Sequence, residues 1–224
     1  MPSNPLPSEP VYIYYTFCDQ QLELNVWLQL MRELPVSLQH KARKYRRWQD
    51  QQAFVFGKLL LKKALKQFSY GEDCLEQLKT NPFNKPILPN IQFNITHAGH
   101  CVICALSKHI PIGVDIEQIK EIDINMFDKV FCDQELSLIR EAADPLYTFF
   151  SYWTIKEAIL KCLGLGFSGD PMLISINRET VFYRNERWTI EKLSLPPNYI
   201  GHLAYQCSKL HLVVIKEDFV CLDD

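Results

Sequence analysis

"IQFNITHAGHCVICALSKHIPIGVDIE", residues 91–117, holds three short runs that we expect to form β-strands. The runs cover residues 91–97, 101–107 and 110–117, and they are rich in the branched and aromatic side chains that favour strands. The preceding segment, "NPFNKPILPN" (81–90), has too much proline and asparagine for regular structure and is predicted to be a loop. A strand-rich centre is therefore predicted for the middle of the chain.

Helical patterns flank this centre on both sides. Before it, a strand candidate at 11–17 ("VYIYYTF") leads into a helical pattern from about 19 to 68, broken near Pro35 and with Ser37 as a candidate N-cap. After it, helical patterns run from about 124 to 163. Strand-like runs then follow: "MLISI" (172–176), "RWTIEKL" (187–193), "YIGHLAYQC" (199–207) and "LHLVVIK" (210–216).

The order strand, helices, strands thus occurs twice, with a seam near residues 113–120. We expect an α+β fold in which two similar α/β halves, 1–113 and 114–224, pack as a pseudo-dimer within one chain. The 224 residues are enough for one large domain or two small ones, and no long linker or low-complexity segment interrupts them.

Composition places the chain among ordinary globular proteins, with 47% hydrophobic and 22% charged residues. No stretch approaches the ~18 apolar residues of a membrane span, and "MPSNPLPSEP" (1–10) does not resemble a secretory signal. The eight cysteines are scattered, as expected for buried thiols in a reducing compartment. Cys101 and Cys104 would face opposite sides of a strand and therefore do not predict a metal site. We expect a cytoplasmic protein without membrane association.

Positive charge is concentrated between residues 41 and 66. Nine of the 24 lysines and arginines lie there, against one acid, Asp50, although the net charge is only -2. This cluster predicts an anionic ligand. An alternative is a module that binds nucleic acid or an acidic partner through residues 41–66, with Tyr45 and Trp48 available for stacking. A pI of about 6.3 and the absence of a base-reading motif argue against that alternative.

Two carboxylates are the main chemical signal in "IGVDIEQIK" (112–120). In a strand, Asp115 and Glu117 share one face, while Val114 and Ile116 share the other. One interpretation is a half-buried strand with a solvated acidic face. The other is a pair of hard oxygen ligands for Mg²⁺, which usually binds one to a few carboxylates and substrate phosphates.

A second signal is the segment "FFSYWTIKEAILKCLGLGF" (149–167), which we expect to be an amphipathic helix closed by glycines. Glu157 and Lys161 are four residues apart and share a face. They form either a surface ion pair, which stabilises little, or part of a site in which Glu157 completes a metal-binding set and Lys161 holds phosphate oxygens.

The third signal is "FNITHAGH" (93–100), which ends a strand in a turn. His97 is either a hydrogen-bonded turn histidine or a donor to a phosphate, and Thr96 adds a hydroxyl. Lys85 and Pro86, in the preceding loop, would place a further cation nearby.

Together the three signals resemble the 4′-phosphopantetheinyl transferases of the surfactin (Sfp) type. That family has an F-N-[IL]-S-H-S block, then a G-[IV]-D-[IL]-E strand, then a W-x-x-K-E-[AS]-x-x-K helix. Here the blocks are residues 93–98 (FNITHA), 113–117 (GVDIE) and 153–161 (WTIKEAILK). The resemblance extends from about residue 37 to 170, and the length suits the two-halved type rather than the short trimeric synthases, so we expect a monomer.

The resemblance implies an enzyme that moves 4′-phosphopantetheine from coenzyme A to a serine of an apo acyl or peptidyl carrier protein, releasing adenosine 3′,5′-bisphosphate. Coenzyme A and the carrier would be its partners, Mg²⁺ its metal (with Mn²⁺ as an alternative), and nucleic acid would not be a ligand. The implied metal ligands are Asp115, Glu117 and Glu157, and the implied catalytic residues are Glu157 (also the candidate base), Lys161 and Asp115. The implied coenzyme-binding residues are Lys161 at the phosphates, His97 and Lys41 at the 3′-phosphate, and Lys85, Pro86 and Thr96 near the nucleotide.

This chain departs from the family pattern at a few positions. Ala53 stands where an arginine usually contacts the 3′-phosphate, so that contact is missing or comes from a neighbour such as Arg43 or Arg47. Asn84 replaces a glycine but still tolerates a left-handed backbone. Thr96 and Ala98 replace two serines.

The family's carrier contacts correspond to "QIKEIDINMFDKVF" (118–131) in this chain. This segment mixes charge with apolar residues such as Met126 and Phe127. They would be either carrier anchors or ordinary core residues of a short helix.

Overall fold

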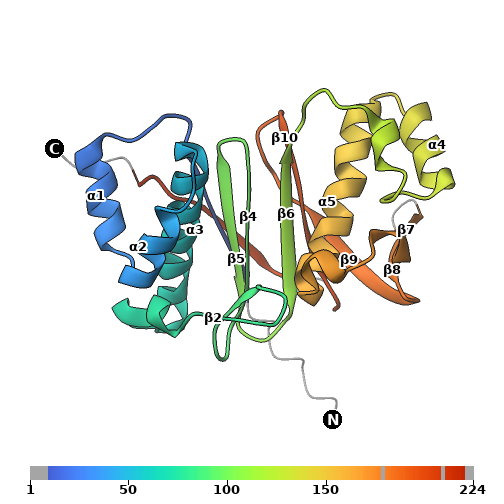
Figure 1. Cartoon of the computed structure of the whole chain (residues 1–224). Helices are drawn as coiled ribbons and strands as arrows, with labels where there is room; N and C mark the ends of the chain where they lie inside the picture. The colour runs from blue at the N-terminus through green and yellow to red at the C-terminus, as the bar shows by residue number, and fades with distance from the viewer. Residues whose placement is uncertain (1–9, 178–179, 208–209, 220–224) are drawn as a thin grey trace, which may run out of the picture.

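Two β-sheets lie against each other at the centre of the molecule, and helices cover their outer faces (Figure 1). The structure is a computed structural model, and it describes residues 10–177, 180–207 and 210–219. One side carries the helices α1 (Leu24–Arg32), α2 (Val36–Ala42) and α3 (Trp48–Leu65). The other side carries α4 (Asp133–Glu141) and α5 (Pro145–Leu163).

The first sheet has the strand order β11-β1-β5-β4. β11 pairs with β1 in parallel, whereas the β1–β5 and β5–β4 pairs are antiparallel. Successive side chains of its central strand point to opposite faces of the sheet. Val102 and Cys104 face α3, and Cys101 and Ile103 face the second sheet. The strands are β1 (Val11–Phe17), β4 (Gln92–Ala98), β5 (Cys101–Ser107) and β11 (Leu212–Lys216).

The second sheet has the order β6-β10-β9-β8-β7 and is antiparallel wherever its pairing is described. Val114 and Ile116 point into the core between the sheets, so Asp115 and Glu117 lie on the face that α5 covers. The strands are β6 (Ile112–Gln118), β7 (Ile174–Asn177), β8 (Thr180–Tyr183), β9 (Glu186–Lys192) and β10 (Tyr199–Tyr205).

The helix α5 is fixed by its ends and by a close approach to β6. Asp144 accepts a hydrogen bond from the backbone N–H of Tyr147 at 2.9 Å, and Gly164 ends the helix in a left-handed conformation with φ 68°. Gly113 allows the helix to lie directly on the strand, because a Cβ there would be 2.0 Å from the carbonyl oxygen of Ala158. This contact brings the polar face of α5 beside Asp115.

Edge strands of the two sheets, β4 and β6, lie side by side (Figure 1). They belong to different sheets. The Oδ1 atom of Asn94 accepts a hydrogen bond from the backbone N–H of Val114 at 2.9 Å and joins them. The junction therefore holds the polar residues of β4 next to the acidic residues of β6.

The α+β class and most predicted elements are confirmed. β1, β4, β5 and β6 match the predicted strands within two residues, and Cys101 and Cys104 are buried on opposite faces of β5. The N-cap prediction was wrong, because Pro35 rather than Ser37 precedes α2. The predicted loop 81–90 contains a short strand, β3 (Pro86–Ile87), which pairs with β2 (Lys79–Thr80). β8 was missed. Among the described residues, no helix is both long and apolar enough to cross a membrane.

Candidate active site

Asp115 is the centre of a polar cluster at the junction of β4, β6 and α5. Its side chain is buried, with the residue only 3% exposed. The hydroxyl of Thr96 donates to its Oδ1 at 3.1 Å, and the ammonium of Lys161 contacts the same oxygen. Lys161 also donates to the Thr96 hydroxyl at 3.0 Å. The solvated acidic face that we considered for β6 is therefore not observed at Asp115.

The other oxygen of Asp115 has no such partner. Oδ2 is buried and forms no hydrogen bond with any described residue. A buried carboxylate oxygen without a partner is costly, because the interior does not replace the water that it loses. This oxygen is therefore available to a ligand that carries positive charge.

Two further carboxyl groups feel the charge of Asp115. Burial, and then repulsion by Asp115, raise the pKa of Glu117 to about 7. Burial and Asp115 also raise the pKa of Glu157, while Lys161 opposes the shift. The indole N–H of Trp153 donates to Glu117 Oε1 at 3.2 Å and holds that side chain in place. The three carboxyl groups thus share a partly dehydrated site with one lysine.

The donor chemistry of this site fits a divalent cation such as Mg²⁺, which prefers carboxylate oxygens. Asp115 Oδ2 has no described partner, and the pKa values of Glu117 and Glu157 are raised. Both observations indicate negative charge that the neighbouring residues do not fully neutralise. The residues are not already gathered as a ligand shell: in the described part of the chain, no three His, Cys, Asp or Glu side chains are grouped to hold a metal. Lys161 neutralises Asp115 instead.

Lys85 lies at the C-terminal end of α5. Its ammonium donates to two carbonyl oxygens of the last turn of α5, those of Lys161 (2.7 Å) and Cys162 (3.2 Å). Burial lowers the pKa of Lys85. Asn84, just before it, has the left-handed backbone expected for this position, with φ 64°. Lys85 and Pro86 line a pocket of about 280 Å³ with Phe93 from β4.

His97 and Lys41 lie on the α3 side of β4. His97 follows Ile95 on the same strand face, and Ile95 packs against α3. Removal of water by neighbouring atoms, followed by repulsion from Lys161, lowers the pKa of His97. Lys41, on α2, is exposed and stands 5.8 Å from the centroid of the Phe54 ring. Ala53, in contrast, lies on the buried face of α3 and belongs to the core.

The predicted site residues thus fall into two groups. Thr96, Asp115 and Lys161 are joined by contacts, and Glu117 and Glu157 interact electrostatically with Asp115. The second group contains Lys41, His97, Lys85 and Pro86. Lys41 and His97 lie on the α3 side of β4, whereas Lys85 lies at the C-terminal end of α5. One described hydrogen bond joins the two groups, from the Lys85 ammonium to the Lys161 carbonyl.

A second pocket adjoins the carboxylates. It has a volume of about 370 Å³ and lies between α5 and the segment that follows this helix. Glu157 and Lys161 form its polar wall, and Trp153 and Leu160 contribute apolar surface. The pocket therefore offers an apolar space that opens beside the charged cluster.

Two buried charged residues near this pocket were not identified from the sequence. The Lys156 ammonium contacts Glu135 Oε2 at 2.8 Å, and the two residues are 1% and 3% exposed. Lys156 also donates to the carbonyl oxygens of Pro171 (3.0 Å) and Ile174 (2.8 Å). The signal was present in the "KEA" block, but spacing within one helix does not reveal a partner on α4.

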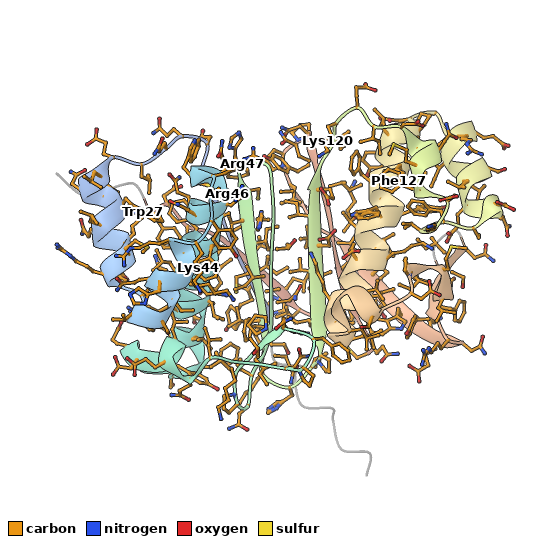
Figure 2. All side chains as sticks on the ribbon, in the orientation of Figure 1. Trp27, Lys44, Arg46, Arg47, Lys120 and Phe127 are labelled. Atoms are coloured by element: carbon orange, nitrogen blue, oxygen red, sulfur yellow. The ribbon has the colours of Figure 1, made fainter. Side chains whose placement is uncertain are left out.

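The segment 118–131 divides between core and surface. Phe127 packs against Phe149 and Trp153, with ring centroids 4.8 and 5.6 Å apart. Met126 is 78% exposed and belongs to the short helical turn η3 (Ile124–Phe127). Figure 2 places Lys120 and Phe127 on the side of the molecule that carries α5. Phe127 is thus partly buried and packs against the core, whereas Met126 is exposed.

Comparison with known proteins places this geometry in a family. Residues 111–204 match the model of the 4′-phosphopantetheinyl transferase superfamily. The chain is 32% identical over 165 residues to the 4′-phosphopantetheinyl transferase gsp of Aneurinibacillus migulanus, covering 69% of this chain and 67% of the relative. It is 27% identical over 162 residues to the 4′-phosphopantetheinyl transferase Sfp of Bacillus subtilis (strain 168), covering 70% and 71%.

A eukaryotic relative is also similar over the central region. The L-aminoadipate-semialdehyde dehydrogenase-phosphopantetheinyl transferase of Schizosaccharomyces pombe is 36% identical over 117 residues, which cover 46% of this chain and 44% of the relative. None of these similarities supports the nucleic-acid alternative for residues 41–66. The fold, the polar cluster and the extent of the similarity to gsp lead to one conclusion: the chain belongs to the 4′-phosphopantetheinyl transferase superfamily.

Proposed function

We propose that this enzyme transfers 4′-phosphopantetheine from coenzyme A to a serine hydroxyl of an apo acyl or peptidyl carrier protein. The observation that carries the proposal is the cluster of Thr96, Asp115 and Lys161 at the junction of the sheets. It combines a buried carboxylate that has a free oxygen with a lysine positioned for phosphate. A pyrophosphate needs such an arrangement, because its negative charge must be neutralised before a hydroxyl attacks phosphorus.

In this proposal Asp115, Glu117 and Glu157 hold Mg²⁺, or Mn²⁺ in its place. A bound divalent cation would neutralise the pyrophosphate and hold its oxygens for displacement. With the charge of Asp115 compensated in this way, Lys161 would donate to phosphate oxygens in place of Asp115 and Thr96.

Glu157 is the proposed general base. It removes the proton of the carrier serine as the serine oxygen attacks the phosphorus that bears the pantetheine arm. The bond from that phosphorus to the bridging oxygen breaks, and adenosine 3′,5′-bisphosphate leaves with the electron pair. Burial and Asp115 raise the pKa of Glu157, which makes its carboxylate a stronger base.

Coenzyme A would contact both groups of site residues. We assign the 3′-phosphate to His97 and Lys41, and the nucleotide to the surroundings of Lys85, Pro86 and Thr96. The pocket of about 370 Å³ beside Glu157 would receive the pantetheine arm, because Trp153 and Leu160 supply apolar surface. The halves 1–113 and 114–224 then correspond to the coenzyme side and the metal side of one site, in a chain that acts as a monomer.

Mass spectrometry of the products tests the proposal. The protein is incubated with coenzyme A, Mg²⁺ and separate apo-carriers from fatty-acid, polyketide and peptide-synthetase systems. A carrier whose mass rises by one phosphopantetheine, together with released adenosine 3′,5′-bisphosphate, is the expected result. Hydrolysis of coenzyme A without carrier modification would instead indicate a phosphodiesterase. A carrier in which the acceptor serine is replaced by alanine serves as the control.

Replacing His97 with alanine should weaken coenzyme A more than 3′-dephospho-coenzyme A. A hydrogen bond to a charged group is worth about 1.5–3 kcal/mol, so the loss should be roughly 10- to 100-fold. The lowered pKa does not prevent this role, since a neutral imidazole still donates one N–H. Titration calorimetry with both ligands measures the difference, and His97→Gln, which keeps a donor, should recover part of it. Equal weakening of both ligands would show that His97 is structural.

Replacing Met126 with aspartate should raise the KM for the carrier at least about ten-fold and leave the KM for coenzyme A unchanged. Met126 is 78% exposed, and its neighbour Phe127 packs against Trp153, which donates to Glu117. Truncation of a central interface anchor commonly costs more than a factor of ten. Steady-state kinetics at saturating coenzyme A provides the measurement. Leu24→Asp on α1, where the residue is 71% exposed, is the matched control. An unchanged carrier KM would place carrier binding elsewhere.

A further inference from the structure

Most lysines at the C-terminal end of α3 are neutralised by acidic partners, but Lys58 is not. The paired residues are Lys62 and Lys66 with Glu72, at 3.2 and 2.8 Å, and Lys63 with Glu217. Lys58 has no hydrogen-bond or ion-pair partner in the described part of the chain. Lys58 lacks an acidic partner because its side chain is buried, whereas the paired lysines reach acidic side chains at the surface.

Lys58 is a buried cation. It is only 9% exposed, and its Nζ lies 5.3 Å from the centroid of the Phe54 ring. Burial lowers the pKa of Lys58 to about 8, so the ammonium is still mostly charged at neutral pH. An aromatic face attracts a cation only weakly compared with the hydration that a buried ammonium loses. An anion next to Lys58 would supply the missing compensation.

A second unpaired lysine stands at the same ring. Lys41 Nζ lies 5.8 Å from the Phe54 centroid, and it too has no hydrogen-bond or ion-pair partner among the described residues. The charge of Lys41 contributes to the lowering of the Lys58 pKa, so the two ammonium groups repel each other. Two like charges at one ring, from α2 and α3, are typical of a site that an anion completes.

The position of Lys58 connects it with the proposed coenzyme site. It directly follows Gly57, where a Cβ would lie 2.9 Å from the Ile95 side chain on β4. His97 is the next residue along the same face of that strand. Asp50 precedes Lys58 by eight residues on α3, and its charge acts on His97. Lys58 therefore belongs to the helix that borders the strand of His97.

We propose that Lys58 is a further ligand of the 3′-phosphate of coenzyme A, beside Lys41 over the Phe54 ring. Lysine is a common phosphate ligand that acts as a point charge. The assignment rests on the proposed transferase function. Lys58 is an alternative to Arg43 or Arg47 as the neighbour that supplies the contact missing at Ala53. Both arginines are exposed, whereas Lys58 is buried.

Replacing Lys58 with methionine, which keeps the length and the apolar stem, tests the site. Calorimetry without carrier should give coenzyme A binding that is about 10- to 100-fold weaker, and 3′-dephospho-coenzyme A binding that changes less than about three-fold. Lys63→Met, which removes an exposed lysine of the same helix, is the matched control and should change neither ligand. Unchanged coenzyme A affinity in Lys58→Met would overturn the assignment.

Thermal unfolding separates this site from a structural role for Lys58. If the buried ammonium awaits an anion, Lys58→Met should raise the Tm of the ligand-free protein, because an apolar side chain replaces an uncompensated charge. Coenzyme A should then raise the Tm of the variant less than that of the wild type. A lower Tm together with equal weakening of both ligands would show that Lys58 serves packing.

Lys41→Met gives an independent measurement, since Lys41 is exposed and its loss should not affect folding. It should reduce the discrimination between the two ligands, and the double variant should lose less than the product of the single losses, because both lysines act on one phosphate. Wild-type protein that does not bind coenzyme A would contradict the proposed function itself. Wild-type protein that binds both ligands equally would contradict only the phosphate site.

Discussion

Asp115→Asn should reduce phosphopantetheine transfer by at least about 100-fold while the protein remains folded. Residues that merely support a metal ligand are commonly worth about 10- to 100-fold in metal affinity or activity, and loss of a charged ligand should exceed this. Asparagine keeps the shape of the side chain and still accepts the hydrogen bond from Thr96. It removes the charge that Lys161 now compensates and that Mg²⁺ would bind.

Asparagine is preferred to alanine because Asp115 is buried. On a solvated acidic face, which was one interpretation of the sequence, truncation of this side chain would leave no cavity. At 3% exposure, alanine would leave a cavity next to Lys161. Transfer is measured by carrier mass, and metal binding by the dependence of coenzyme A affinity on Mg²⁺. Near wild-type turnover at saturating Mg²⁺ would rule out the ligand assignment. Glu76→Gln, at an exposed acid of the short helical turn Glu72–Gln77, is the matched control, because it lies outside the segment 118–131.

The parts of the site that could be predicted from sequence are those set by local periodicity. Alternation along residues 112–118 placed Asp115 and Glu117 on one face, and the four-residue spacing placed Glu157 beside Lys161. These relations depend on strand and helix geometry alone. The same periodicity did not indicate that α5 covers the acidic face, because burial depends on what packs against a strand. Gly113 carried the relevant signal, as the residue that allows α5 to approach.

The contacts that join distant segments were beyond this kind of analysis. Thr96 reaches Asp115 across two edge strands, and β11 returns to pair with β1. Neither contact leaves a trace in local composition. The basic cluster 41–66 was recognised as a whole, but its members looked equivalent until the structure separated the paired lysines from Lys58. The distinction between these lysines thus depends on their partners in the structure rather than on their neighbours in sequence.

The second large effect concerns stability. Lys156→Met should lower the free energy of unfolding by about 3–5 kcal/mol, because it leaves a buried carboxylate without its charge partner. Glu135 is 3% exposed and contacts the Lys156 ammonium at 2.8 Å. Its carboxylate also accepts hydrogen bonds from the backbone N–H groups of Cys132 (3.1 Å) and Ile176 (3.3 Å). The pair therefore ties α4, α5 and β7 together, and urea unfolding measures its loss.

The effect should depend on which partner is removed. Glu135→Gln keeps an oxygen that accepts from Cys132, but it leaves the buried Lys156 charge with only the carbonyls of Pro171 and Ile174. Replacing both residues, Glu135→Gln with Lys156→Met, removes both charges and should cost less than the sum of the single losses, since neither charge is then left unpaired. Additive losses would show that the two side chains stabilise the fold independently. Lys156 directly precedes Glu157, and its carbonyl partner Pro171 lines the pocket beside α5. The variants should therefore also lower transfer at temperatures where they remain folded.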